Sequence, residues 1–121
     1  MSEIGYKHYM FVDGDLPGNG EDPELPGHEA LMITNRHDRD AHIRVTLYFE
    51  DREPVEGLHI TVPARRVVCH RTDLPFGEEG CRIPFGQYSL ELESDIPVCA
   101  SFGRLDRRHD LGYYVTGYCA V

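Results

Sequence analysis

The sequence predicts an all-β fold, a single-domain antiparallel β-sandwich or jelly-roll-like domain of about eight strands. Hydrophobic and polar residues alternate with a period of two through several short segments, which indicates strands with one buried face. Turn-forming residues separate these segments about every 8–12 residues, which is the spacing typical of sandwich folds. No segment keeps a helical period for as many as about ten residues.

The first half of the chain predicts three strands and two connecting loops. Residues 4–12 form the first strand, and residues 13–27, which are rich in glycine, proline and acidic residues, form a long loop. Residues 29–35 form the second strand. A polar hairpin loop, residues 36–40, leads into the third strand, residues 41–50.

The third strand has the clearest alternation. Its apolar face consists of Ala41, Ile43, Val45, Leu47 and Phe49. Its polar face consists of His42, Arg44, Thr46, Tyr48 and Glu50. An imidazole, a guanidinium, a phenol and a carboxylate on one face favour a surface that meets a ligand or partner, beyond what solubility requires.

The middle of the chain continues the pattern. A turn over residues 51–57 precedes a fourth strand at residues 58–62, and residues 65–71 form a fifth. Residues 72–74 are compatible with a single helical turn, and residues 75–80 form a loop.

The last third predicts three further strands. Residues 87–93 form one, and residues 95–97, Asp-Ile-Pro, are expected to turn the chain. Residues 98–103 form the next strand, and residues 111–121, rich in aromatic and β-branched residues, form the last.

Length and composition limit the class of protein. A chain of 121 residues supports one hydrophobic core, so we expect one domain over residues 1–121. No apolar run approaches the about 18 residues that cross a bilayer, and the N-terminus lacks a signal-peptide pattern. The four cysteines are widely spaced without a CxxC pair. We therefore expect a soluble cytoplasmic protein without membrane insertion or a structural zinc site.

The chain is strongly acidic, with 12 basic and 21 acidic side chains and a formal charge of −9. Nucleic acid is therefore an unlikely partner, because phosphate binding needs a basic surface. Residues 65–66 and 104–108 are the only candidates for a local basic patch.

Several residues, in this order and at this spacing, resemble the sensory rhodopsin transducer family. They are His28-Glu29, Asn35, Ala41-His42, Tyr48, residues 51–54, the run Thr-Val-Pro-Ala-Arg-Arg at residues 61–66, Asp73-Leu74, Pro97 and Arg104-Leu105-Asp106. The combination of residues 61–66 with Arg104-Leu105-Asp106 about forty residues later is specific, and the likeness covers most of the chain.

The resemblance implies a sandwich-like subunit that assembles as a cyclic tetramer. It also implies a cytosolic signalling or ligand-binding role without catalysis, with a membrane photoreceptor as a possible partner. Some relatives have been suggested to bind sugars or other small molecules. The alternative function is accordingly a carbohydrate- or small-molecule-binding accessory protein of sugar metabolism.

The candidate ligand or interface residues are His28, Glu29, Asn35, Arg65, Arg66, Arg104 and Asp106. Arg65 and Arg66 are expected to leave opposite faces of a strand, whereas Arg104 and Asp106 share a face. One interpretation is a polar pocket for hydroxyl or carboxylate groups. The other is an ion-pair network between subunits.

No catalytic residue, metal ligand set or cofactor site is predicted. The serines lack a nucleophile-elbow pattern. His42 and His59 point outward on what we expect to be neighbouring strands, but two imidazoles alone rarely form a metal site. We therefore expect a non-enzymatic protein without a cofactor.

Overall fold

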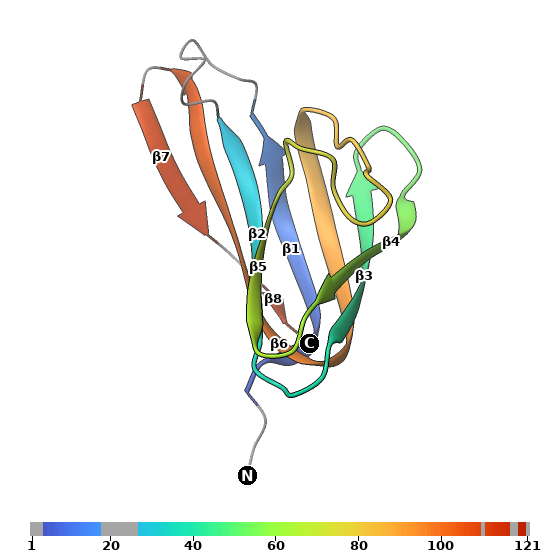
Figure 1. The fold of residues 1–121 in the computed structure, drawn as a ribbon. Coiled ribbons are helices and arrows are strands. Elements are labelled where there is room, and N and C mark those ends of the chain that lie inside the picture. Colours follow the sequence, from blue (N-terminus) through green and yellow to red (C-terminus); the bar gives the residue numbers. More distant parts are fainter. Residues whose placement is uncertain (1–3, 18–26, 110, 117–118, 121) are drawn as a thin grey trace.

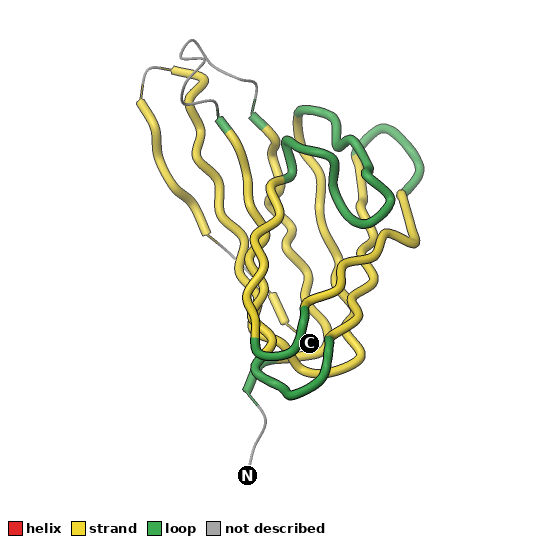
Figure 2. Tube along the Cα trace, viewed as in Figure 1, coloured by secondary structure: helices red, strands yellow, loops and turns green. Residues whose placement is uncertain are grey.

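The computed structural model describes residues 4–17, 27–109, 111–116 and 119–120, and the side chains as far as Leu105. The regular elements of these residues are all strands (Figure 2), which confirms the predicted all-β fold. No helix among them is long and apolar enough to cross a membrane. The strands are β1 (Tyr6–Leu16), β2 (His28–Asn35), β3 (Ala41–Phe49), β4 (Val55–Val62), β5 (Arg66–Arg71), β6 (Gly86–His109), β7 (Leu111–Thr116) and β8 (Cys119–Ala120).

All the strand pairs are antiparallel and join into one curled sheet with two parts (Figure 1). Sheet A has the order β4-β3-β6-β1-β8. Sheet B has the order β5-β2-β6-β7. The long strand β6 belongs to both parts, so the two layers of the predicted sandwich are continuous with each other through one strand.

The prediction of a turn at residues 95–97 is wrong, because β6 continues through them. Ser94 is the last residue of β6 paired with β3, and Cys99 is the first paired with β2. Between Tyr6 and His8 of β1, the register on β6 jumps from Val98 to Glu93. These extra residues form a β-bulge, which bends a strand and lets it pass from one sheet to another.

Burial shows the same change of sheet. Residues 96–98 are buried in succession, where an ordinary strand would alternate. The hydroxyl of Ser94 donates to the carbonyl of Ile96 at 2.6 Å and so satisfies part of the distorted backbone. A sequence that is typical of a turn is here the crossing between the two sheets.

Other strand limits also differ from the predictions. β1 continues to Leu16, through the first residues of the predicted loop, because Gly14 lets its backbone approach β6. A Cβ at Gly14 would lie 2.7 Å from the carbonyl oxygen of Tyr88. The predicted last strand divides into β7, which pairs with β6, and β8, which pairs with β1. Residues 72–74 form a turn and no helix.

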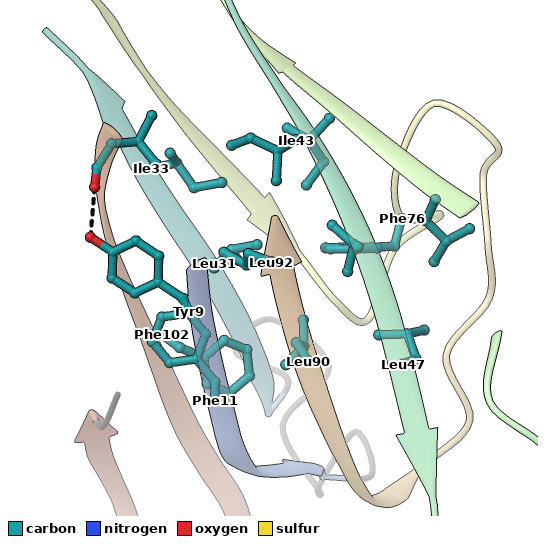
Figure 3. Close-up of a cluster of buried hydrophobic side chains, with 14 of the residues drawn as sticks. Tyr9, Phe11, Leu31, Ile33, Ile43, Leu47, Phe76, Leu90, Leu92 and Phe102 are labelled. Carbon is teal, nitrogen blue, oxygen red and sulfur yellow. Dashed lines mark hydrogen bonds between the residues drawn. The ribbon is translucent and has the colours of Figure 1, made fainter. Parts of the chain in front are cut away.

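The core lies on the inner side of the curl, between the two parts of the sheet (Figure 3). Phe11 and Phe102 stack with ring centroids 5.8 Å apart and so join β1 to β6. Tyr9 stacks on Phe11, and its hydroxyl donates to the carbonyl of Val98 at 2.6 Å. The hydrophobic face predicted for the third strand is buried here through Ile43, Val45 and Leu47. Aromatic packing therefore supports the region where β6 changes sheets.

Two glycines test the close approach of the N-terminal segment to this crossing. Gly5 and Gly57 both have positive φ, 92° and 75°, so alanine is strained at either position. A Cβ at Gly5 would lie 2.1 Å from the carbonyl oxygen of Val98, whereas one at Gly57 would meet nothing within 4 Å. We expect Gly57→Ala to cost about 1 kcal/mol and Gly5→Ala at least about 2 kcal/mol more, because only the latter overpacks. Urea denaturation measures both, and equal costs would contradict this arrangement.

Candidate functional site

The outward face of sheet A displays rows of polar side chains from neighbouring strands. Residues paired across antiparallel strands lie on the same face. One row across β1, β6, β3 and β4 consists of His8, Glu93, Arg44 and His59. The polar face predicted from the alternation of residues 41–50 is thus extended by three neighbouring strands.

The rows border a hollow of about 460 Å³, a volume within the range of small-molecule sites. We call it the outer hollow. Its lining residues are Arg44, Thr46, Tyr48, Glu56, Gly57, His59, Glu91 and Glu93. Three strands, β3, β4 and β6, contribute them, so the site stands on a rigid sheet.

One set of lining groups is held in place by hydrogen bonds. Glu91 accepts a hydrogen bond from the hydroxyl of Tyr48 at 2.6 Å, and its other oxygen lies 2.6 Å from Nε2 of His8. The hydrogen bond from Tyr48, followed by that from His8, holds the pKa of Glu91 below its usual range. Likewise, His59 contacts Glu79 at 2.6 Å and lowers the pKa of that carboxyl. These groups are fixed before any ligand arrives.

A second set remains available. Arg44, Glu56 and Glu93 are exposed, and within the described part of the chain none of them forms a hydrogen bond or an ion pair. Arg44 stands directly opposite Glu93 in the register of β3 and β6. A guanidinium and two carboxylates therefore face the outer hollow with their bonding capacity largely free.

The predicted residues Glu29 and Arg104 meet, but in a buried position. They are direct partners across β2 and β6, with 3.5 Å between a guanidinium nitrogen and a carboxylate oxygen. Glu29 has no exposed surface and also accepts hydrogen bonds from the hydroxyl of Tyr88 at 2.5 Å and the backbone N–H of Asp15 at 2.8 Å. Burial raises the pKa of Glu29, and these donors oppose the shift. We call this group the buried carboxylate cluster.

The cluster has a structural role rather than an open site. Its members come from β1, β2, the turn after β5 and both halves of β6, since Thr72 also donates to Glu29 at 3.3 Å. Arg104 further reaches the backbone carbonyl of Asp13 at 3.2 Å. A buried charge pair with several donors fixes the relative position of these segments.

The other predicted residues, Asn35, Arg65 and Arg66, lie at the far end of β2. Glu29 and Asn35 are six residues apart on this strand, a separation of roughly 20 Å. The single cluster expected from the sequence is thus divided between the two ends of sheet B. His28 lies beside Glu29 on β2, opposite Leu105. The backbone of Asp106 pairs with Tyr113, and its side chain lies outside the described residues.

Asn35 joins two loops at this end of the molecule. It is fully buried, its amide nitrogen donates to the carbonyls of Arg39 and Val62 at 2.8 and 3.1 Å, and its oxygen accepts from the backbone of His37. The assumption that Arg65 belongs to a strand is wrong. Arg65 lies in the turn before β5 with φ of 60°, and its backbone N–H donates to the carbonyl of His37 at 3.1 Å.

The free groups of the outer hollow are not among the candidate site residues predicted from the sequence. The alternation at residues 41–50 identified Arg44 as outward, but nothing local pairs it with Glu56 or Glu93, because that pairing depends on strand register. Among the described side chains, no group of three histidine, cysteine or acidic residues is arranged to hold a metal ion. The arrangement therefore favours recognition through hydrogen bonds and charge.

The buried carboxylate cluster predicts unequal costs for two tyrosine substitutions. The hydroxyls of Tyr88 and Tyr9 are both buried donors, but Tyr88 donates to a carboxylate and Tyr9 to a backbone carbonyl. We expect Tyr88→Phe to lower the free energy of unfolding by about 2 kcal/mol and Tyr9→Phe by about 1 kcal/mol, because hydrogen bonds to charged groups are stronger. Chemical denaturation at neutral pH measures both, and a larger cost for Tyr9→Phe would contradict the assignment.

The two adjacent arginines predict substitutions of opposite sign. A non-glycine residue at φ of 60° costs about 1–2 kcal/mol, more than the entropy that glycine loses on folding. We expect Arg65→Gly to raise stability by about 0.5 kcal/mol. Arg66→Gly, within strand β5, should lower stability by about 0.5–1 kcal/mol. Thermal unfolding of the two variants compares them, and equal destabilisation would disprove the strained turn.

Comparisons with known proteins agree with this fold. A protein-family model described as Anabaena sensory rhodopsin transducer matches residues 4–119. The crystal structure of Thermotoga maritima 1070 is 32% identical, covers 96% of this chain and 94% of that chain, and has a TM-score of 0.81. The Anabaena sensory rhodopsin transducer is 34% identical over 88% of this chain and 94% of its own, with a TM-score of 0.73. No curated protein matches. The chain therefore belongs to the Anabaena sensory rhodopsin transducer family.

Proposed function

We propose that this protein is a non-enzymatic, transducer-type signalling module that acts by binding a small polar ligand in the outer hollow. One observation supports the proposal most. Arg44, Glu56 and Glu93 face the hollow without partners, while Tyr48 and Glu91 beside them are fixed by a hydrogen bond. Because the strands and the fixed groups beside them are already ordered, the entropy cost of binding is confined to the three unpaired side chains.

The chemistry of the hollow supports binding rather than catalysis. Its lining groups lie on the outer face of the sheet and several are exposed, so water has access to them. Enzyme sites gain much of their electrostatic effect by excluding water. Nucleic acid is a poor candidate, because three carboxylates and one guanidinium line the hollow and would repel phosphate groups.

Membership of the family supports a protein partner as well. The name of the Anabaena relative associates that protein with a sensory rhodopsin. We propose by analogy that this chain acts in the cytoplasm and passes a signal to or from a membrane photoreceptor or another receptor. A separate surface for such a partner is offered by the exposed arginines Arg36 and Arg65, on loops beside Asn35, and Arg66, at the start of β5.

The second candidate function is a carbohydrate-binding accessory protein of sugar metabolism. The ring of Tyr48, which is 38% exposed at the hollow, favours it together with the free carboxylates. Carboxylates accept hydrogen bonds from hydroxyl groups, and an aromatic ring offers an apolar surface to a sugar. The two candidates share the outer hollow and differ in the ligand.

A thermal-shift panel tests ligand binding. Monosaccharides, sugar acids and amino acids are screened, and a true ligand raises the melting temperature by mass action. We expect Arg44→Ala to abolish the shift and Arg52→Ala, an exposed arginine paired with Asp51 outside the hollow, to retain it. Arg104→Ala is unsuitable, because it leaves Glu29 buried without its cation. A shift that persists in Arg44→Ala would contradict the assignment to the hollow.

We also propose that copies of this chain assemble through the outward face of sheet B. Two adjacent rows of paired residues on this face carry no charge: Thr34 with Val67 and Cys99, and Met32 with Cys69 and Ser101. The next row contains Arg71, whose charge is paired with Asp73. On a chain of charge −9, the uncharged rows are where two copies meet with the least repulsion. The cyclic tetramer implied by the family is our expectation for the assembly.

Two valines of equal exposure test the assembly. Val67 on sheet B and Val12 on β1 are each 64% exposed. We expect Val67→Lys to dissociate the oligomer, because it places a desolvated charge in the interface, and Val12→Lys to leave it intact. Size-exclusion chromatography with light scattering at micromolar concentration measures the mass. A monomeric unmodified protein, or dissociation by Val12→Lys alone, would contradict the proposal.

A further inference from the structure

The arrangement of charge in the outer hollow indicates a ligand class. Arg44 and Glu93 are opposite each other on β3 and β6, at a spacing of about 5 Å between Cβ atoms. Within the described residues they nevertheless form no ion pair with each other. Their charged ends therefore stand apart, and each is open to a separate group of one small molecule.

The neighbouring groups do not neutralise this pair. Glu91, the next outward residue on β6, is occupied by Tyr48 and His8, and His59 is occupied by Glu79. Glu56 adds a second free carboxylate from β4. The free groups are thus one cation, Arg44, and two anions, Glu56 and Glu93. A positively charged group of a ligand can bind between the two carboxylates, and a negatively charged group can bind Arg44.

We propose that the outer hollow binds a small ligand that bears an ammonium group and a carboxylate a few bonds apart, as amino acids do. The ammonium group is recognised by Glu93 and Glu56, and the carboxylate by the guanidinium of Arg44, whose planar fork suits it. This inference rests on the proposed function and names the ligand class of the same site.

Other ligand classes match these groups less well. A phosphate or a dicarboxylate would be attracted by one guanidinium but repelled by the three carboxylates that line the hollow. A simple amine leaves Arg44 unused. A neutral sugar can form hydrogen bonds with all three free groups, but it brings no opposite charge and leaves each of their charges unneutralised.

Matched ligands and matched variants test the inference. Calorimetry and backbone amide NMR shifts are measured with L-glutamine, with 4-aminobutyramide, which lacks its carboxylate, and with glutaramate, which lacks its ammonium group. Glucose is the neutral probe. We expect L-glutamine to bind at least about tenfold more tightly than the other three, because each of them lacks one or both of its charged groups.

The variants separate the two halves of recognition. Arg44→Gln should weaken L-glutamine about tenfold and leave 4-aminobutyramide unchanged, whereas Glu93→Gln should weaken 4-aminobutyramide and spare glutaramate. Arg52→Gln and Glu53→Gln, exposed outside the hollow, are the charge-matched controls and should have no effect.

The outcomes distinguish the inference from the proposed function. If glucose binds as tightly as L-glutamine and shifts the amides of Thr46 and Gly57, the hollow is a binding site but the ligand class is wrong. If no probe shifts these amides and no ligand of the wider panel depends on Arg44, the proposed function fails as well.

Discussion

The bulge at residues 94–97 of β6 is the constraint on which the rest of this structure depends. Because of it, one strand pairs with β3 before the bulge and with β2 after it, while β1 follows it across the bulge from Glu93 to Val98. The consecutive burial of residues 96–98 fixes the bend, where the backbone of Gly5 lies close to Val98 and the hydroxyl of Tyr9 donates to the carbonyl of Val98. Without this crossing, the two parts of the sheet would share no strand and the core would have no closed side.

Polar groups then secure the two ends of sheet B in different ways. At one end, Glu29 and Arg104 place a charge pair in the interior and draw together segments that are distant in sequence. At the other end, the neutral amide of Asn35 joins the loop before β3 to the end of β4. Both ends are therefore fixed internally, and the groups that remain free to meet a ligand lie on the outside of sheet A.

The sequence predicted the local features and missed those set by pairing between distant segments. Alternation located the strands and showed that Arg44 points outward, because a period of two is a property of each strand alone. Asp95-Ile96-Pro97 has turn-forming composition, and only the register with β1 and β3 shows that β6 continues through it. Arginine is rarely found at positive φ, so nothing in the local sequence indicated that Arg65 lies in a turn. The separation of Arg65 from Arg104 likewise becomes apparent only from the pairing of β2 with β5 and β6.

The sharing of β6 has a mechanical consequence. Glu91 and Glu93 border the hollow on one side of the bulge. On the other side, within the same strand, Cys99 and Ser101 belong to the uncharged rows of sheet B. A ligand that changes the twist of β6 at the first surface is therefore expected to alter the second. The proposed ligand binding and the proposed self-association would then be thermodynamically linked, each changing the affinity of the other by the same factor.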